Sequence, residues 1–79
     1  MIKLQFFTTL GCHLCEDAEL LFSPMIKNGV IKVESVDIFD DEDLMERYGV
    51  RIPVIKKIET GEELGWPFDS HSLFQFLDI

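Results

Sequence analysis

The stretch that decides how this chain folds reads Thr8-Thr9-Leu10-Gly11-Cys12-His13-Leu14-Cys15. The residues before it alternate as in a strand, with Ile2, Leu4 and Phe6 on one side, so a strand is predicted over residues 2–8. After it the apolar period becomes helical. The apolar positions of this helix are Leu14, Ala18, Leu21, Phe22 and Met25. The stretch therefore joins a strand to a helix.

Pro24 interrupts the helical pattern. A proline has no N–H to donate to the carbonyl four residues back, so Pro24 is expected to kink the helix or to end it near Ser23. Asn28-Gly29 is a stop signal in either case. Residues 30–38 are a second strand candidate. A strand–helix–strand unit implies two parallel strands with a right-handed crossover.

An acidic run follows the second strand. Asp40 or Asp41 can cap a short helix that Gly49 ends, so the acidic residues between positions 37 and 46 are interpreted as a helix start and a solvated face. The alternative is a docking patch for a basic partner.

The last part of the chain is predicted to form a hairpin and a helix. Residues 54–58 are a third strand candidate, and a turn at Thr60-Gly61 leads to a short fourth strand over residues 62–65. Asp69 or Ser70 can cap the last helix. Its inward residues are expected to be Leu73, Phe74 and Leu77. The order β-α-β-α-β-β-α predicts an α/β domain with a four-stranded mixed sheet and flanking helices.

The spacing of Cys12 and Cys15 has a chemical consequence. Two cysteines three residues apart at a helix start can bring their sulfur atoms within bonding distance. The Cys12 sulfur then lies beside unpaired N–H groups and the positive end of the helix dipole, which both favour the thiolate. The thiolate is the nucleophile of disulfide exchange, and Cys15 can resolve a mixed disulfide formed on Cys12.

Two other interpretations of the cysteine pair compete with a redox dithiol. Half of a zinc site is one, but zinc usually takes four ligands, and only His13 and His71 remain as nitrogen donors in a chain with two cysteines. A purely structural disulfide is the other, but so short a loop restricts the unfolded chain little. A two-residue spacer that follows a strand and opens a helix favours redox chemistry.

With these residues in view, the chain resembles the thioredoxin fold, and within it the small glutaredoxin-like proteins. The resemblance rests on residues 8–15, on the helix after them, and on Tyr48-Gly49-Val50-Arg51-Ile52-Pro53-Val54. It covers essentially the full length. It implies a single thioredoxin-like domain over residues 1–79 and a thiol–disulfide oxidoreductase with Cys12 and Cys15 as its catalytic residues.

The resemblance also assigns substrate contacts. Members of this fold carry a cis-proline that faces the dithiol, and Pro53 matches that position. Ile52 would then offer its amide and carbonyl to an extended substrate. The alternative is an ordinary trans proline that starts an edge strand. Arg51 is the one basic residue expected near the site, and His13 either favours the Cys12 thiolate or is an exposed spacer.

The glutathione site of glutaredoxins carries over less well. Such proteins often have Lys or Arg shortly before the dithiol, where this chain has Thr8-Thr9-Leu10-Gly11. They also have a Gly-Gly and an Asp before the last helix, for which only Gly65 and Asp69 could be counterparts. Glutathione therefore stays a weakly supported co-substrate, and neither a cofactor nor a metal is expected.

Composition excludes some classes of partner and indicates a compartment. Seven basic and 15 acidic residues give a net charge of −8, which argues against nucleic acid and anionic membranes and favours basic protein surfaces. No apolar stretch approaches the roughly 20 residues of a membrane span. Residues 1–7 are too short and too quickly polar for a signal peptide, so a cytoplasmic monomer is expected, where cysteines are more often chemical than architectural.

We therefore expect the Cys12–Cys15 dithiol to exchange with the disulfide of a protein or small thiol, and a reducing enzyme or glutathione to restore it. Two alternatives from other classes stay open. The same cysteines could hold a metal or an iron–sulfur cluster shared between two subunits, as in some glutaredoxin relatives. The domain could also be an adaptor that keeps the fold without turnover.

Overall fold

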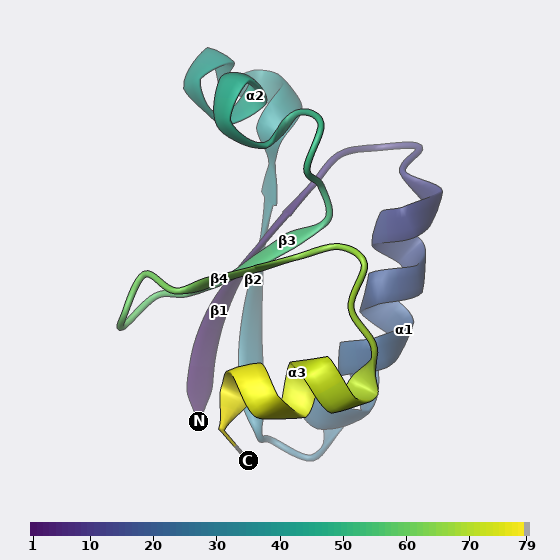
Figure 1. Cartoon of the computed structure of the whole chain (residues 1–79), viewed down its shortest axis with the longest axis vertical. Coiled ribbons are helices and arrows are strands. Elements are labelled where there is room, and N and C mark those ends of the chain that lie inside the picture. Colours follow the sequence, from purple (N-terminus) through teal and green to yellow (C-terminus); the bar gives the residue numbers. More distant parts are fainter. Residues whose placement is uncertain (79) are drawn as a thin grey trace.

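The sheet is built around its first strand, β1. The computed structural model describes residues 1–78, and Ile79, the last residue of the predicted domain, lies outside the described residues. The elements are β1 (Ile2–Thr8), α1 (His13–Lys27), β2 (Ile31–Asp37), the 3-10 helix η1 (Ile38–Asp40), α2 (Glu42–Tyr48), β3 (Val54–Lys57), β4 (Glu63–Gly65) and α3 (Ser70–Leu77). The strand order is β2-β1-β3-β4, with β1 and β2 parallel and the other pairs antiparallel (Figure 1). The predicted α/β class and mixed four-stranded sheet are confirmed.

One face of the sheet carries the main core. Alternation along β1 turns Leu4 and Phe6 to this face, where both are fully buried. From α1, Phe22 packs edge-to-face on Phe6, with ring centroids 5.0 Å apart. The other buried members are Cys15, Ala18, Met25, Ile31, Ile55, Phe68, Leu73 and Leu77. Because these residues come from both α1 and α3, the two helices cover the same face.

The opposite face carries a smaller second core. Phe7 and Val54, which are paired across β1 and β3, meet Ile38 and Tyr48 there. Tyr48 lies at the end of α2, and its ring stacks on that of Phe7 at 4.2 Å. Figure 1 shows α2 beyond the upper end of the strands, where β1 ends and the loop to α1 begins. The second core therefore supports the same end of the sheet that carries the cysteines.

The acidic run starts two helices, whereas the sequence predicted one, with Asp40 or Asp41 as its cap; the Asp41 cap of α2 is confirmed, and η1 with its Asp37 cap was not predicted. The Asp37 side chain accepts a hydrogen bond from the N–H of Phe39 at 2.9 Å and so caps η1. The Asp41 side chain accepts from the N–H groups of Asp43 and Leu44 and caps α2. Gly49 ends α2, also as predicted. The strand limits agree with the predicted ones at four of the eight ends and differ by one residue at the other four.

One of two alternatives for Pro24 is excluded, and one expectation about α3 is wrong. Pro24 does not end α1 near Ser23, because the helix continues to Lys27 before the predicted stop at Asn28, and the alternative of a kink stays a prediction. Phe22 and Met25, on either side of the proline, are both buried in the main core, and this packing offsets the hydrogen bond that the proline lacks. Phe74 does not point inward and is 44% exposed, because Leu73 and Leu77, four residues apart, already form the buried stripe of α3.

Candidate functional site

The turn between β1 and α1 places both cysteines at a helix start. Gly11 has a φ of +77°, a conformation that glycine reaches without a steric penalty. Cys12 is the N-cap of α1, and its Sγ accepts a hydrogen bond from the N–H of Cys15 at 3.1 Å. The two residues are joined in a disulfide, with their Cα atoms 5.2 Å apart. The spacing of Cys12 and Cys15 predicted that their sulfur atoms can come within bonding distance, and the disulfide confirms this.

The two sulfur atoms have different surroundings. Cys15 is 2% exposed and belongs to the main core, whereas Cys12 is half-buried at the edge of that core. An external disulfide can therefore reach Cys12 and not Cys15. In the reduced protein, the N–H donor and the positive end of α1 favour a thiolate at Cys12. This arrangement suits a nucleophile backed by a buried resolving thiol.

The loop over residues 49–53 runs beside the end of β1. Phe7 pairs with Val54, and continuing that antiparallel register places Pro53 opposite Thr8, four residues before Cys12. The Ile52–Pro53 peptide bond is cis, as the resemblance implied. The alternative of an ordinary trans proline is therefore wrong. Ile52 packs against both cores. The loop that carries Ile52 and Pro53 thus meets the sheet at the end from which the chain leads to the cysteines.

One expected role of Ile52 changes in the structure. Its N–H already donates to the carbonyl of Tyr48 at 3.0 Å, so it is not free to bind an extended substrate. The Ile52 carbonyl accepts no backbone N–H from the described residues. Only half of the predicted backbone contact is therefore available. The carbonyl of Pro53 is also occupied, because it accepts from the N–H of Trp66 at 3.0 Å.

Tyr48, Arg51 and Glu63 form a polar network behind this loop. The Tyr48 hydroxyl donates to Oε2 of Glu63, and the Arg51 guanidinium donates to Oε1 at 3.3 Å. The guanidinium also lies over the Tyr48 ring, 5.4 Å from its centroid. The hydrogen bond from Tyr48 holds the pKa of the Glu63 carboxyl below its usual value, and Arg51 acts in the same direction. Burial, followed by the neighbouring Glu63, raises the pKa of the Tyr48 hydroxyl.

Exposed side chains lie on the loop before Cys12 and on the 49–53 loop. Leu10 is 92% exposed and Val50 is fully exposed, although both are large apolar side chains. His13 is also exposed, with Nδ1 3.6 Å from a carboxylate oxygen of Glu16. This placement fits the spacer interpretation of His13.

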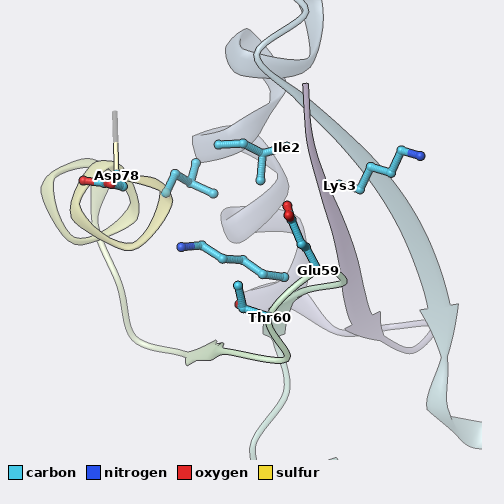
Figure 2. Close-up of a pocket in the computed structure, with 7 residues that line it drawn as sticks. Ile2, Lys3, Glu59, Thr60 and Asp78 are labelled. Carbon is cyan, nitrogen blue, oxygen red and sulfur yellow. The ribbon is translucent and has the colours of Figure 1, made fainter.

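A hollow of about 240 Å³ lies next to the cysteines. Its lining consists of Thr8, Thr9, Leu10, Gly11, Cys12, Cys15, Glu16 and Glu19. None of these lining residues is Lys or Arg. A second hollow of about 260 Å³ lies at the opposite end of β1, between Ile2, the Glu59-Thr60 turn and Asp78 of the α3 end (Figure 2). It shares no residue with the first, so we do not assign it to the site.

The two possible counterparts of a glutathione site, Asp69 and Gly65, also have structural roles. The Asp69 carboxylate caps α3 by accepting the N–H of Ser72 at 2.8 Å, and this hydrogen bond holds the pKa of Asp69 below its usual value. Gly65 is the last residue of β4, opposite Val54.

No three or more His, Cys, Asp or Glu side chains within residues 1–78 are grouped so as to hold a metal ion. No helix in that range is long and apolar enough to cross a bilayer.

Sequence reasoning missed Glu63 and the role of Tyr48. Tyr48 was part of the segment that carried the resemblance, but nothing in its local pattern distinguished it from an ordinary core aromatic residue. Glu63 lies 15 residues further along, and only the β3–β4 register brings it to Tyr48. A lone glutamate in a predicted hairpin carries no signal of such a partner.

Comparison with known proteins agrees with this geometry. The profile of the family described as Glutaredoxin-like domain (DUF836) matches residues 3–78. The chain belongs to this glutaredoxin-like family. No functionally curated protein matches it.

Solved structures of similar proteins extend the comparison. The X-ray structure of protein XcR50 from X. campestris is 36% identical, with a TM-score of 0.82 and 95% of each chain covered. The solution structure of protein Ne2328 from Nitrosomonas europaea is 28% identical, with a TM-score of 0.79 over 95% of this chain and 89% of that one. Thioredoxin 1 from Thermosipho africanus TCF52B is 15% identical, with a TM-score of 0.66 over 98% and 96% of the two chains, which shows the fold alone. The fold of this glutaredoxin-like protein is therefore that of thioredoxin, and its cysteine pair supports a redox-type function.

Proposed function

We propose that this glutaredoxin-like protein is a thiol–disulfide oxidoreductase of the cytoplasm that acts on disulfides of protein segments. The observation that carries the proposal is the contrast between the two cysteines. Cys12 is half-buried at the N-terminus of α1, where its Sγ accepts the N–H of Cys15, while Cys15 lies buried behind it. A nucleophile that is activated and accessible, with a shielded second thiol, is what exchange requires.

The reaction proceeds in two balanced steps. The Cys12 thiolate attacks one sulfur of the substrate disulfide, forms a mixed disulfide and releases the other substrate sulfur as a thiolate. The Cys15 thiolate then attacks the Cys12 sulfur, closes the Cys12–Cys15 disulfide and releases the second substrate thiolate. The substrate gains two electrons and two protons, and the chain loses them. A thiol reductant, either a reducing enzyme or glutathione, returns the disulfide to the dithiol.

Neighbouring residues supply contacts to the substrate chain. In this proposal the unpaired carbonyl of Ile52 accepts an N–H of an extended substrate, and Pro53 and His13 border the reacting sulfur atoms. The exposed side chains of Leu10 and Val50 supply apolar contact area on either side. An exposed, apolar border fits a polypeptide better than a small, charged thiol.

Three variants test the proposal. The Cys12→Ser variant is expected to lose reduction of a protein disulfide, such as that of insulin, and the Cys15→Ser variant to stop as a covalent mixed disulfide detectable by intact mass. His71→Ala, on α3, is the control for a substitution away from the site. Reduction by Cys12→Ser at the rate of the wild type would overturn the proposal.

A redox titration in glutathione buffers adds an independent measurement. A two-electron transition between about −280 and −150 mV is expected, since dithiols of this spacing span that range. Absence of any transition in the accessible range would contradict a working dithiol.

A further inference from the structure

The guanidinium of Arg51 is held by two neighbours, Glu63 and Tyr48. Its Nη2 atom is 3.3 Å from Oε1 of Glu63, and it lies over the Tyr48 ring. Its backbone N–H donates to the Tyr48 carbonyl at 2.8 Å. The Glu63 carboxylate is itself fixed by the Tyr48 hydroxyl, and its side chain is 26% exposed. The side chains of Arg51 and Glu63 are thus both held in position by neighbouring groups.

The position of Arg51 gives this pairing a consequence for the dithiol. Arg51 directly precedes Ile52 and Pro53, and it is the basic residue of the loop that runs beside the end of β1. The hollow next to the cysteines has Glu16 and Glu19 in its lining and no Lys or Arg. The charge of Arg51 is therefore the nearest one along this loop that could attract an anion, and Glu63 compensates it.

We infer that Glu63 is a specificity-determining residue. By pairing with Arg51, it removes the cation that an anionic thiol or disulfide would need, and so directs the dithiol toward neutral and basic substrates. The inference rests on the proposed exchange activity. It predicts that loss of the Glu63 charge, and not of any nearby carboxylate, makes anionic disulfides better substrates.

Small disulfides of different charge provide the test. The reduced protein is mixed separately with anionic dithiodipropionate, neutral bis(hydroxyethyl) disulfide and cationic cystamine. In each case the two protein thiols become the Cys12–Cys15 disulfide, and one small disulfide becomes two thiols. The rate is followed by acid quenching, alkylation and intact mass. Ratios of the rates report charge selectivity independently of the reactivity of Cys12.

Glu63→Gln is the main variant, because glutamine can still accept the Tyr48 hydroxyl hydrogen. We expect the anionic-to-neutral rate ratio to rise about two- to fivefold, the range of one exposed ion pair, and the rise to vanish at high salt. Adding Arg51→Gln to Glu63→Gln should cancel the rise, since the released cation is then absent. Glu62→Gln is the matched control. It changes the net charge equally but affects the pair between Glu62 and Lys57, at 3.7 Å.

Each outcome decides between the possibilities. An equal rise in Glu63→Gln and Glu62→Gln would show a net-charge effect and overturn the inference, as would no rise in either. If Glu63→Gln does not fold, as judged by circular dichroism, the Arg51→Gln variant alone still tests whether the charge of Arg51 is compensated. A compensated Arg51 predicts a change of less than about twofold in the anionic-to-neutral ratio, and a larger fall overturns the inference. No oxidation by any of the three disulfides, together with no reduction of insulin, would instead refute the proposed exchange activity.

Discussion

Replacing Tyr48 with Phe should measure how strongly the polar network holds the loop over residues 49–53. The substitution keeps the ring that stacks on Phe7 and the carbonyl that accepts the N–H groups of Arg51 and Ile52. It removes only the hydroxyl that donates to Glu63. The perturbation is therefore a single hydrogen bond to a charged acceptor, with the apolar packing left in place.

The magnitude follows from the burial of the two partners. A hydrogen bond to a charged group contributes about 1.5–3 kcal/mol to the free energy of unfolding. The Glu63 side chain is 26% exposed, so water can partly replace the lost donor, and the lower limit of about 1.5 kcal/mol applies. For a domain of 60–100 residues, each kcal/mol corresponds to a change in Tm of about 4–8 °C. Tyr48→Phe should therefore lower the Tm by about 6–12 °C at neutral pH.

The effect should depend on pH in one direction. The hydrogen bond from Tyr48 lowers the pKa of Glu63 in the folded protein below its ordinary value of 4.5. A carboxyl with a depressed folded pKa stabilises the protein above its unfolded pKa and loses this contribution as the pH falls through the folded value. The difference in Tm between Tyr48→Phe and the wild type should therefore shrink as the pH falls below 4.5.

Thermal unfolding followed by circular dichroism provides the assay, at neutral pH and at about pH 3. Glu63→Gln is the companion variant, because it removes the charge but keeps an acceptor, and its Tm should fall less than that of Tyr48→Phe. The reasoning would be refuted by a Tyr48→Phe variant within about 2 °C of the wild type at neutral pH. An undiminished difference in acid would refute the assignment of the effect to the Glu63 charge.

Three further predictions concern the core, the loop and the cysteines. Leu73→Ala, which leaves a cavity at a fully buried position, should reduce the free energy of unfolding in urea by about 2–5 kcal/mol, whereas Phe74→Ala, at an exposed position of the same helix, should cost clearly less. Gly49→Ala should lower the Tm and slow protein-disulfide reduction, because its Cβ would overlap the carbonyl of Met45 and displace the loop that follows; an unchanged reduction rate would separate the loop from activity. Protein purified without oxygen should be colourless, and a visible absorption band would instead favour the shared-cluster hypothesis for Cys12 and Cys15.

Local patterns were enough to predict most of the fold. The alternation of Ile2, Leu4 and Phe6 identified both a strand and its buried face, because side chains on a strand alternate between the two faces of the sheet. The change from that period to a helical one identified where α1 begins, and the cysteine spacing placed both sulfur atoms in its first turn. These features depend only on residues that are close along the chain, and so they can be predicted from the sequence.

The predictions failed where the structure of a segment, or the partner of a residue, depends on packing against other elements and not on its neighbours along the chain. An end of α1 near Ser23 was one of two expected outcomes because Pro24 removes a hydrogen bond, yet the helix continues, with Phe22 and Met25 buried in the core on either side of the proline. Phe74 was expected inside because it is apolar, but α3 has room for one narrow stripe. Glu63 was missed because its partner is set by strand register, which has no local signal.

The two cores support different parts of the candidate site: the main core holds Cys15, and the second core holds the ends of the 49–53 loop. Cys15 belongs to the main core, under α1 and α3, and so the thiols depend on that packing. Tyr48 and Val54, at the two ends of the 49–53 loop, belong to the second core under α2. Ile52 packs against both cores and is the residue where they meet. Changes in the second core can therefore shift the 49–53 loop without touching Cys15, and under the proposed function we expect them to alter substrate selectivity more than the reactivity of the sulfur atoms.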